Sequence, residues 1–327
     1  MVLSLVLIGA GFSLSKAQPM VSFALVIAGI ILFPHRRSTS AVLIKAVMIA
    51  ALSALFYTSY VSQNPWEKGS AKITFIDVGQ GDSILIELSD GKNVLIDGGL
   101  KEYGSKVVSV LKEKNIRHLD LLIASHPHAD HIGGLPEVIQ ACQPYLIIEP
   151  VFPSELNPST WSVQQFDRTV QNLHIPRKTV RSGDILLEGN SYRLDVISPA
   201  ESLQSDDLND YSLMTRLRVG KTVFLFTADA GYTAELEMLN RNLHCDVLQA
   251  GHHGSFGSTS TAFLEETTPD YAVISVGKDN DHNLPNSYVL SRLEDYGARI
   301  YRTDSDGSVT FETDCKTISV SFEKAQE

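Results

Sequence analysis

The sequence predicts an α/β fold in which two mixed β-sheets carry helices on their outer faces, preceded by an apolar membrane region. From Ala71 onward, short apolar runs with strand-like spacing alternate with segments whose apolar residues recur at helical spacing. Residues 1–64 contain four basic residues and no Asp or Glu, whereas residues 65–327 carry −15, because the whole chain carries −11. This composition break predicts a membrane region over residues 1–62 and a separate acidic domain over residues 70–323.

Two apolar stretches predict about two transmembrane helices. Met20–Phe33 is uninterrupted, Met1–Leu14 before it is also apolar, and Ala41–Tyr60 is broken only by Lys45. A helix needs about 20 apolar residues to span a bilayer, so the first region reaches that length only with residues from Ser15–Pro19, or forms two shorter pieces. The loop Pro34–Ser38 between them contains two arginines, and short basic loops stay cytoplasmic. We therefore expect anchoring in the cell membrane, with the acidic domain on the extracytoplasmic side. A cleaved signal peptide is the alternative, but two stretches are too many for it.

The acidic domain is expected to consist of two halves with similar alternation of strands and helices. The continuous apolar run Leu119–Ala124 predicts a strand that is buried on both faces. The other expected strands are Lys72–Asp77, Ser83–Glu87, Asn93–Ile96, Arg193–Ile197, Leu213–Val219, Thr222–Thr227, Asp246–Ala250, Tyr271–Val276, Arg299–Arg302, Ser308–Thr313 and Lys316–Phe322. The expected helices are Lys101–Lys114, Ile132–Ala141, Ala230–Asn240, Thr261–Glu266 and Tyr288–Tyr296.

Charge and cysteine content exclude some classes of function. An acidic domain is not typical of proteins that hold nucleic acid mainly by charge. It does not exclude a nuclease, since bound divalent metals supply local positive charge. The three cysteines form no C-x-x-C pair, so neither a zinc ribbon nor a redox dithiol is indicated.

A dense group of metal-ligand residues directly follows the expected strand Leu119–Ala124. His126, His128, Asp130 and His131 fall within six residues, and Gly133-Gly134 comes next. In an extended chain, residues two apart point the same way, so the first two histidines can reach one ion. Asp130 and His131 can reach a second ion as the chain turns into a helix. Imidazole with carboxylate suits Zn²⁺, Mn²⁺ or Fe²⁺, and paired ions activate water and hold phosphoryl or carbonyl oxygens.

This segment resembles the signature of the metallo-β-lactamase superfamily. More narrowly, the domain is similar to the C-terminal hydrolase domain of the ComEC/Rec2 family of DNA-uptake competence proteins. Further matching blocks occur in the family's order at Phe75–Ser83, Leu95–Gly99, Phe224–Ala230, Gly251–Ser255 and Tyr301–Asp304 with Gly307. The resemblance covers roughly residues 70–323. It implies an αββα sandwich that binds two divalent metal ions, zinc or manganese, at one edge.

The resemblance also implies roles for further residues. Asp229 would bridge the two ions, and Asp130 would steer the attacking water. His252 and His253 follow an expected strand, and adjacent residues of an extended chain point to opposite faces. One of them would therefore face the metals, as a ligand or as proton donor to the leaving group, while the other packs. Both stay candidates, His252 as the proton donor and His253 as a ligand. The remaining acidic residues of the matching blocks are expected to orient ligands or cap turns: Asp77, Asp82 and Asp97.

Three positions depart from the family pattern. Ala228 replaces the usual Gly before the bridging carboxylate. Leu284 stands where the family has a His, and His282, two residues earlier, is a candidate replacement. The superfamily's separate His before the bridging Asp has no counterpart; Asn209 and Asp210 stand there as candidate metal or substrate ligands.

These features predict a membrane-tethered, metal-dependent phosphodiesterase or nuclease that takes part in DNA uptake. Its expected partners are the membrane, single-stranded DNA and a subunit of a DNA-uptake channel. Two alternatives remain: an esterase of cell-envelope phosphodiesters such as phosphorylcholine esters, and a non-catalytic partner of the channel. Because the family's full proteins contain a large polytopic pore, we expect this chain to be a split subunit, a truncated product or a fragment.

Overall fold

The computed structural model describes residue 49, residues 69–156 and residues 158–323. The chain divides into the units Met1–Trp66 and Glu67–Glu327, and nearly all described residues belong to the second unit. Among the described residues, none of the helices combines the length and apolar character that crossing a bilayer requires. The two transmembrane helices predicted within residues 1–62 fall outside the described residues, apart from Ile49.

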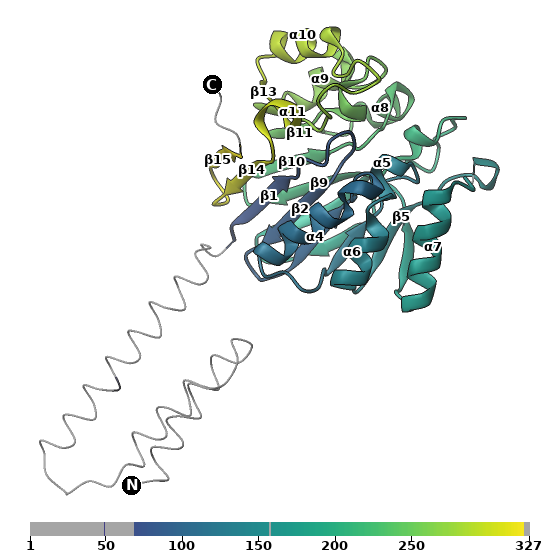
Figure 1. Ribbon diagram of the computed structural model, residues 1–327. Coiled ribbons are helices and arrows are strands. Elements are labelled where there is room, and N and C mark those ends of the chain that lie inside the picture. Colours follow the sequence, from purple (N-terminus) through teal and green to yellow (C-terminus); the bar gives the residue numbers. More distant parts are fainter. Residues whose placement is uncertain (1–48, 50–68, 157, 324–327) are drawn as a thin grey trace, which may run out of the picture. The chain divides into compact units, whose positions relative to one another are not determined.

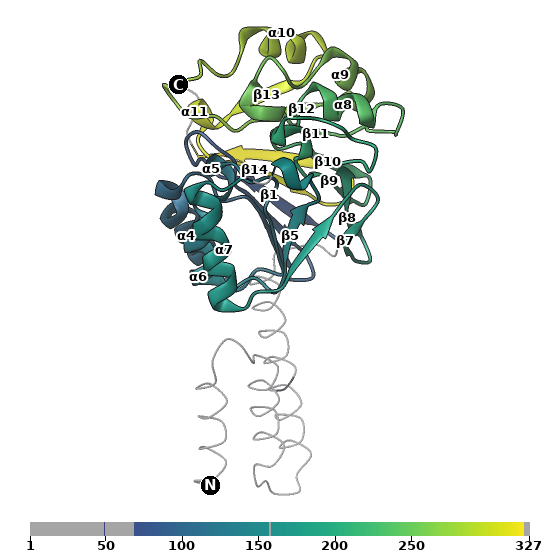
Figure 2. The same cartoon turned by 90° about the vertical axis from the view of Figure 1, so that its right-hand side faces the viewer.

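Two β-sheets pack face to face in the second unit (Figures 1 and 2). The first sheet has the strand order β15-β14-β1-β2-β3-β4-β5-β6. Its strands are β1 (Ala71–Phe75), β2 (Ile84–Leu88), β3 (Asn93–Ile96), β4 (Leu121–Ile123), β5 (Ile147–Pro150), β6 (Arg177–Val180), β14 (Val309–Thr313) and β15 (Ile318–Phe322). Strands β3 to β6 run parallel, whereas β14 returns from the end of the chain to pair antiparallel with β1.

The second sheet has the strand order β13-β12-β11-β10-β9-β8-β7. Its strands are β7 (Ile185–Glu188), β8 (Tyr192–Ser198), β9 (Met214–Val219), β10 (Thr222–Phe226), β11 (Val247–Gln249), β12 (Tyr271–Ile274) and β13 (Arg299–Arg302). Strands β7 to β10 are antiparallel neighbours, and β10 to β13 are parallel. Each sheet is therefore mixed, as the sequence predicts.

The central core lies between the two sheets. Phe75 and Phe311 of the first sheet pack against Phe226 and Phe224 of the second, with ring centroids 6.1 and 6.4 Å apart. Along β2, Ile84 and Ile86 point into this central core, whereas Leu85 points to the opposite face and packs under the outer helices. This period-two alternation gives each sheet two buried faces.

Helices cover the outer face of each sheet (Figure 2). The first sheet carries α4 (Gly104–Glu113), α6 (Leu135–Cys142) and α7 (Trp161–Leu173), and the second carries α8 (Tyr232–Met238), α9 (Thr261–Thr267) and α10 (Ser287–Asp295). The layers are thus helix, sheet, sheet and helix, which confirms the expected αββα sandwich.

Two regions differ from the expected elements. The helix predicted over Ile132–Ala141 is split into α5 (Ala129–Ile132) and α6, because backbone groups at the break bond to neighbouring loops. The carbonyl of Asp130 accepts from the Asp82 N–H, and the Gly134 N–H donates to the carbonyl of Gly99. The segment 147–188 contains β5, β6, β7 and α7, which the sequence did not reveal; β6 and β7 are short and mostly exposed, so their apolar pattern is weak.

Candidate metal centre

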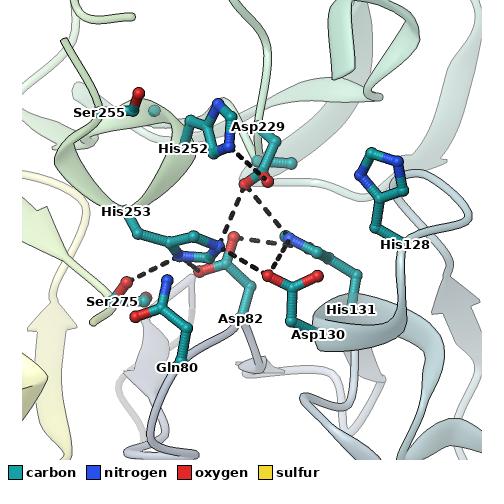
Figure 3. A network of polar contacts seen from close by, with 12 residues as sticks. Gln80, Asp82, His128, Asp130, His131, Asp229, His252, His253, Ser255 and Ser275 are labelled. Carbon is teal, nitrogen blue, oxygen red and sulfur yellow. Dashed lines mark hydrogen bonds and ion pairs between the residues drawn. The ribbon is translucent and has the colours of Figure 1, made fainter. Parts of the chain in front are cut away.

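The predicted site residues converge at the carboxyl ends of four strands (Figure 3). The loops after β3 and β4 carry Asp97 and the segment His126–His131, and those after β10 and β11 carry Asp229 and His252-His253. Because β3 is parallel to β4 and β10 to β11, each pair of loops emerges at one edge of its sheet. The face-to-face packing of the sheets then brings the two edges together.

Four side chains form what we call the inner group: Asp130, His131, Asp229 and His253. Their candidate ligand atoms all lie within 4.8 Å of one another. His131 Nε2 is 3.2 Å from Asp229 Oδ1, and His253 Nε2 is 3.2 Å from Asp130 Oδ2. Three of the four residues are buried, so the group is largely shielded from water. Two imidazoles and two carboxylates are a donor set that suits a divalent cation.

Three side chains form the outer group: His126, His128 and Asp229. His126 Nε2 is 3.0 Å from His128 Nδ1 and 3.7 Å from Asp229 Oδ2. Asp229 therefore belongs to both groups, with Oδ1 toward the inner group and Oδ2 toward the outer one. The structure divides the H-x-H-x-D-H segment as the sequence predicts, with the first two histidines on one side and Asp130 and His131 on the other.

Neighbouring groups fix the orientation of the two inner histidines. Asp97 is fully buried behind His131 and lies 2.8 Å from its Nδ1; it also accepts a hydrogen bond from the Ser125 N–H. The Nδ1 of His253 donates to the carbonyl of Ser275 at 2.8 Å. Both rings therefore carry their proton on Nδ1 when neutral, which leaves each Nε2 free to bind a cation.

The inner group leaves buried polar atoms without hydrogen-bond partners. These atoms include His131 Nε2 and Asp229 Oδ1, which face each other. Such orphaned buried atoms are rare in native proteins, since each costs free energy unless something binds it. Their arrangement is what a cation between them would require, so the residues present fit a divalent metal.

Electrostatics lead to the same conclusion. Burial raises the pKa of Asp229, but the charges of His131 and His253 outweigh it and hold the pKa well below its ordinary value. Burial lowers the pKa of His253, yet Asp229 and the hydrogen bond to Asp130 raise it to about 9. Burial raises the pKa of Asp82 to about 6 against the opposing charge of His253. The carboxylates of the inner group thus favour protonated histidines beside them, and a divalent cation could replace those protons.

His252 and His253 both face the site, so the expectation that only one would do so is wrong. Their backbones are not extended: the φ angles are 50° and 55°, in the left-handed region. Two left-handed residues in succession curl the chain, which turns both rings toward Asp229. His253 belongs to the inner group, whereas His252 lies nearer the outer group, with Nε2 at 3.6 Å from Asp229 Oδ2 and its side chain 34% exposed.

Gln249 is a functional neighbour that the sequence reasoning missed. Its Nε2 donates to Asp82 Oδ2 at 2.7 Å, and its Oε1 accepts from the backbone N–H groups of Thr227 and Ala228. It therefore clamps the turn that presents Asp229. Ala228 has φ 47°, a left-handed value that explains why the family prefers Gly there. A polar residue inside the buried strand β11 was the available signal.

The remaining predicted residues lie elsewhere. Asp77 accepts from the Gly79 N–H and pairs with Lys106, as expected of a turn residue. Asp210 is buried and accepts from Ser205 Oγ, and His282 is exposed on the loop after β12. None of the clusters of potential His, Cys, Asp or Glu ligands among the described residues includes Asp77, Asp210 or His282. Asn209 precedes β9, and its Oδ1 is buried without a hydrogen-bond partner.

The fold agrees with the comparisons with known proteins. The model of the metallo-beta-lactamase superfamily matches residues 76–278. The chain belongs to the metallo-β-lactamase superfamily. Within it, the curated relatives are of the competence-protein ComEC/Rec2 type. The chain is 31% identical to "ComE operon protein 3" of Bacillus subtilis, over 76% of this chain and 34% of that protein. It is 31% identical to "Recombination protein 2" of Haemophilus influenzae, over 74% of this chain and 29% of that protein.

The chain is also similar to a third competence-type relative and to a solved structure. "Competence protein ComA" of Neisseria gonorrhoeae is 27% identical over 79% of this chain and 35% of its own length. The chain thus spans about a third of the length of these relatives. The solved metallo-beta-lactamase fold protein YhfI of Bacillus subtilis matches with a TM-score of 0.50 at 16% identity, covering 75% of this chain and all of that one, which supports the fold alone. The chain is therefore a metal-dependent hydrolase of this fold with competence-protein relatives.

Proposed function

We propose that the protein is a two-metal phosphodiesterase that acts as a nuclease in DNA uptake, tethered to the membrane with its hydrolase domain outside the cytoplasm. One observation carries the catalytic part: Asp229 offers one oxygen to each of two adjacent ligand groups. A carboxylate shared in this way is suited to bridge two cations. Paired cations are used repeatedly for cleavage of phosphate esters.

The two groups divide the ligands between two ions, zinc or manganese. The inner group would hold one ion, and the outer group would hold the other. When bound, the ions supply Lewis acidity, which lowers the pKa of a water molecule and offsets the negative charge of the phosphate oxygens. The outer group has one ligand fewer, and Asn209 remains a candidate to complete it.

Asp130 and His252 are placed to handle protons. Burial raises the pKa of Asp130, but the hydrogen bond from His253 and the charge of His131 hold it below its ordinary value. Asp130 is therefore ionised at neutral pH, and its carboxylate can accept a hydrogen bond from the attacking water and orient it. His252 is partly exposed beside Asp229, so it can reach an entering substrate and donate a proton to the leaving oxygen.

One feature supports DNA as the substrate, and one feature opposes it. The names of two relatives link them to competence and to recombination. The net charge of −15 on residues 65–327 repels a polyanion, so cations at the site would have to offset this repulsion. The membrane, single-stranded DNA and a DNA-uptake channel subunit remain the proposed partners.

A hydrolysis assay with the full chain tests the catalytic proposal. The purified protein, loaded with Mn²⁺ or Zn²⁺, should cleave both bis-p-nitrophenyl phosphate and end-labelled single-stranded DNA. His128→Ala should abolish both activities. The matched control is His244→Ala, because His244 is exposed and its Nδ1 contacts Thr268 Oγ1, a residue outside both ligand groups. Metal binding without any turnover would contradict the enzyme and favour a non-catalytic channel partner.

A fusion assay tests the proposed topology. Alkaline phosphatase fused to the C-terminus should be active, because this enzyme folds only outside the cytoplasm. A silent but stably expressed fusion would overturn the extracytoplasmic placement without touching the catalytic proposal.

A further inference from the structure

Two large aromatic side chains are exposed close to the candidate metal centre. Phe256 is 65% exposed and Tyr288 is 68% exposed. Their ring centroids are 5.9 Å apart with an interplanar angle of 74°, so the rings form a corner. Single exposed apolar residues are normal on protein surfaces, but two in contact near a candidate active site form a surface that can bind a ligand.

The protein backbone fixes this corner beside the site. Phe256 is three residues after His253, which places the two Cα atoms within about 11 Å of each other. The Asn286 N–H donates to the carbonyl of Gly254 at 2.9 Å, which ties the start of α10 to the loop. Ser255, the residue before Phe256, lies at the edge of the polar network near His252 (Figure 3). A ligand at the metal centre can therefore extend onto the two rings.

Arg292 gives the corner a positive charge. Its guanidinium donates to the carbonyl of Phe256 at 3.4 Å, and its central carbon lies 5.8 Å from the centroid of the Phe256 ring. Arg292 therefore occupies the place over the Phe256 ring that a quaternary ammonium ligand would take. Its charge would repel such a ligand, but it would not repel a neutral nucleobase with a phosphate nearby.

We propose that Phe256 and Tyr288 form a platform on which a nucleobase of single-stranded nucleic acid stacks, next to the phosphodiester held at the metal centre. This inference rests on the proposed function and adds the part of the substrate that the metals do not contact. Aromatic side chains stack on any base, so such a site tolerates every sequence. Other proteins that bind single strands gain affinity from a basic groove. In this acidic domain, base stacking would supply that affinity instead.

The test measures how much the bases contribute to binding. The full metal-loaded chain is titrated against a labelled, cleavage-resistant phosphorothioate oligonucleotide, and against an abasic oligonucleotide of equal length, by fluorescence anisotropy. The wild-type protein should prefer the base-bearing strand by about 5- to 150-fold for each stacked base. In the double variant Phe256→Ala/Tyr288→Ala this ratio should fall close to one, whereas Phe256→Trp should retain it.

Tyr145→Ala is the matched control, because Tyr145 is 65% exposed and stacks on His118 at the amino ends of β4 and β5, opposite the site. It should leave the ratio unchanged. An unchanged ratio in the double variant, or no measurable binding of the base-bearing strand by the wild type, would overturn the platform. So would binding of phosphorylcholine that depends on Phe256 without any preference for bases. Hydrolysis of bis-p-nitrophenyl phosphate, which has no base, reports separately on the proposed function.

Discussion

The inner and outer groups differ in how firmly the protein holds their ligands. In the inner group, Asp97 and the Ser275 carbonyl fix both imidazoles, and four candidate ligands converge. In the outer group only three converge, and His128 is not fully buried. Preorganised ligands with oriented rings bind metals more tightly. The inner group is therefore suited to retain a cation, whereas the more exposed outer group is suited to admit a substrate.

Removing the shared carboxylate should have the largest effect, because it belongs to both halves. Asp229→Ala should lower kcat/KM for bis-p-nitrophenyl phosphate by about 10³-fold or more, since metal Lewis acidity contributes several kcal/mol to the barrier. Steady-state kinetics measures this loss. Asp246→Ala, at the start of the β11 segment and away from the ligands, is the comparison variant. Near-normal activity in Asp229→Ala would contradict the proposal that Asp229 is a ligand shared by the inner and outer groups.

Metal content should distinguish the two groups. His253→Ala removes an inner ligand and should lower the bound metal, measured by elemental analysis after dialysis, more than His128→Ala does. The physical reason is that the inner group has four ligands and buried supports, so it contributes most of the affinity. Equal metal loss in the two variants would show that the difference between the groups has no energetic consequence.

A smaller effect is expected from replacing Asp97, which orients His131 of the inner group. Asp97→Asn keeps the shape but weakens the hold on His131 Nδ1, so metal affinity should fall about 10- to 100-fold. Competition with a chelator measures this affinity. Because Asp97 also accepts from the Ser125 N–H, a thermal melt in chelator must show that the variant is folded. Unaltered affinity in a folded variant would mean that ring orientation does not limit binding.

The free energy of unfolding should depend on Glu235, which supports the loop that carries His252 and His253. The buried Glu235 carboxylate accepts from the backbone N–H groups of Thr259 and Ser260, and the Thr259 hydroxyl accepts from the Gly251 N–H. Glu235→Gln leaves one N–H without an acceptor and should lower the free energy of unfolding by about 1–3 kcal/mol. Glu237→Gln, on the same helix and less buried, is the control. Denaturant titration measures both.

The same residue predicts a pH dependence. Burial raises the pKa of Glu235 above its ordinary 4.5, so the folded protein binds its proton more tightly than the unfolded chain does. Its contribution to stability is therefore fully present below pH 4.5 and is lost as the pH rises through the folded pKa. Comparing the wild type with Glu235→Gln across this window should show a flatter pH profile in the variant; parallel profiles would contradict the assignment.

The smallest effect is expected at His282. It is exposed on its loop, and Asn280 accepts from its backbone N–H. His282→Ala should therefore change kcat/KM by no more than about twofold, as is usual for surface substitutions. A large loss would show that the loop closes over the outer group and supplies the ligand that Leu284 replaces.

The sequence predicted most of the strands and the ligand segment, because both depend on local patterns. The period-two alternation of β1 to β3 and the apolar run of β4 predict these strands directly. The H-x-H-x-D-H segment is compact enough to be recognised from sequence. The relation between distant segments could not be derived in the same way. The left-handed turns at His252 and His253 depend on the surrounding loops, and the clamp from Gln249 to Asp82 joins residues 167 positions apart. Neither leaves a periodic signal.

The pairing of β14 with β1 has a consequence for the way the protein is made. Ile73 lies opposite Phe311, so β1, the first strand of the domain, can form this pairing only after β14 near its end has been synthesised. During synthesis, the edge of β1 stays open until nearly all of the chain has emerged, and an open strand edge invites pairing with other chains. A product that stops before Ser308 would keep every candidate ligand yet lack β14 and β15, the two strands that extend the sheet beyond β1. Such a chain should aggregate rather than function at reduced rate.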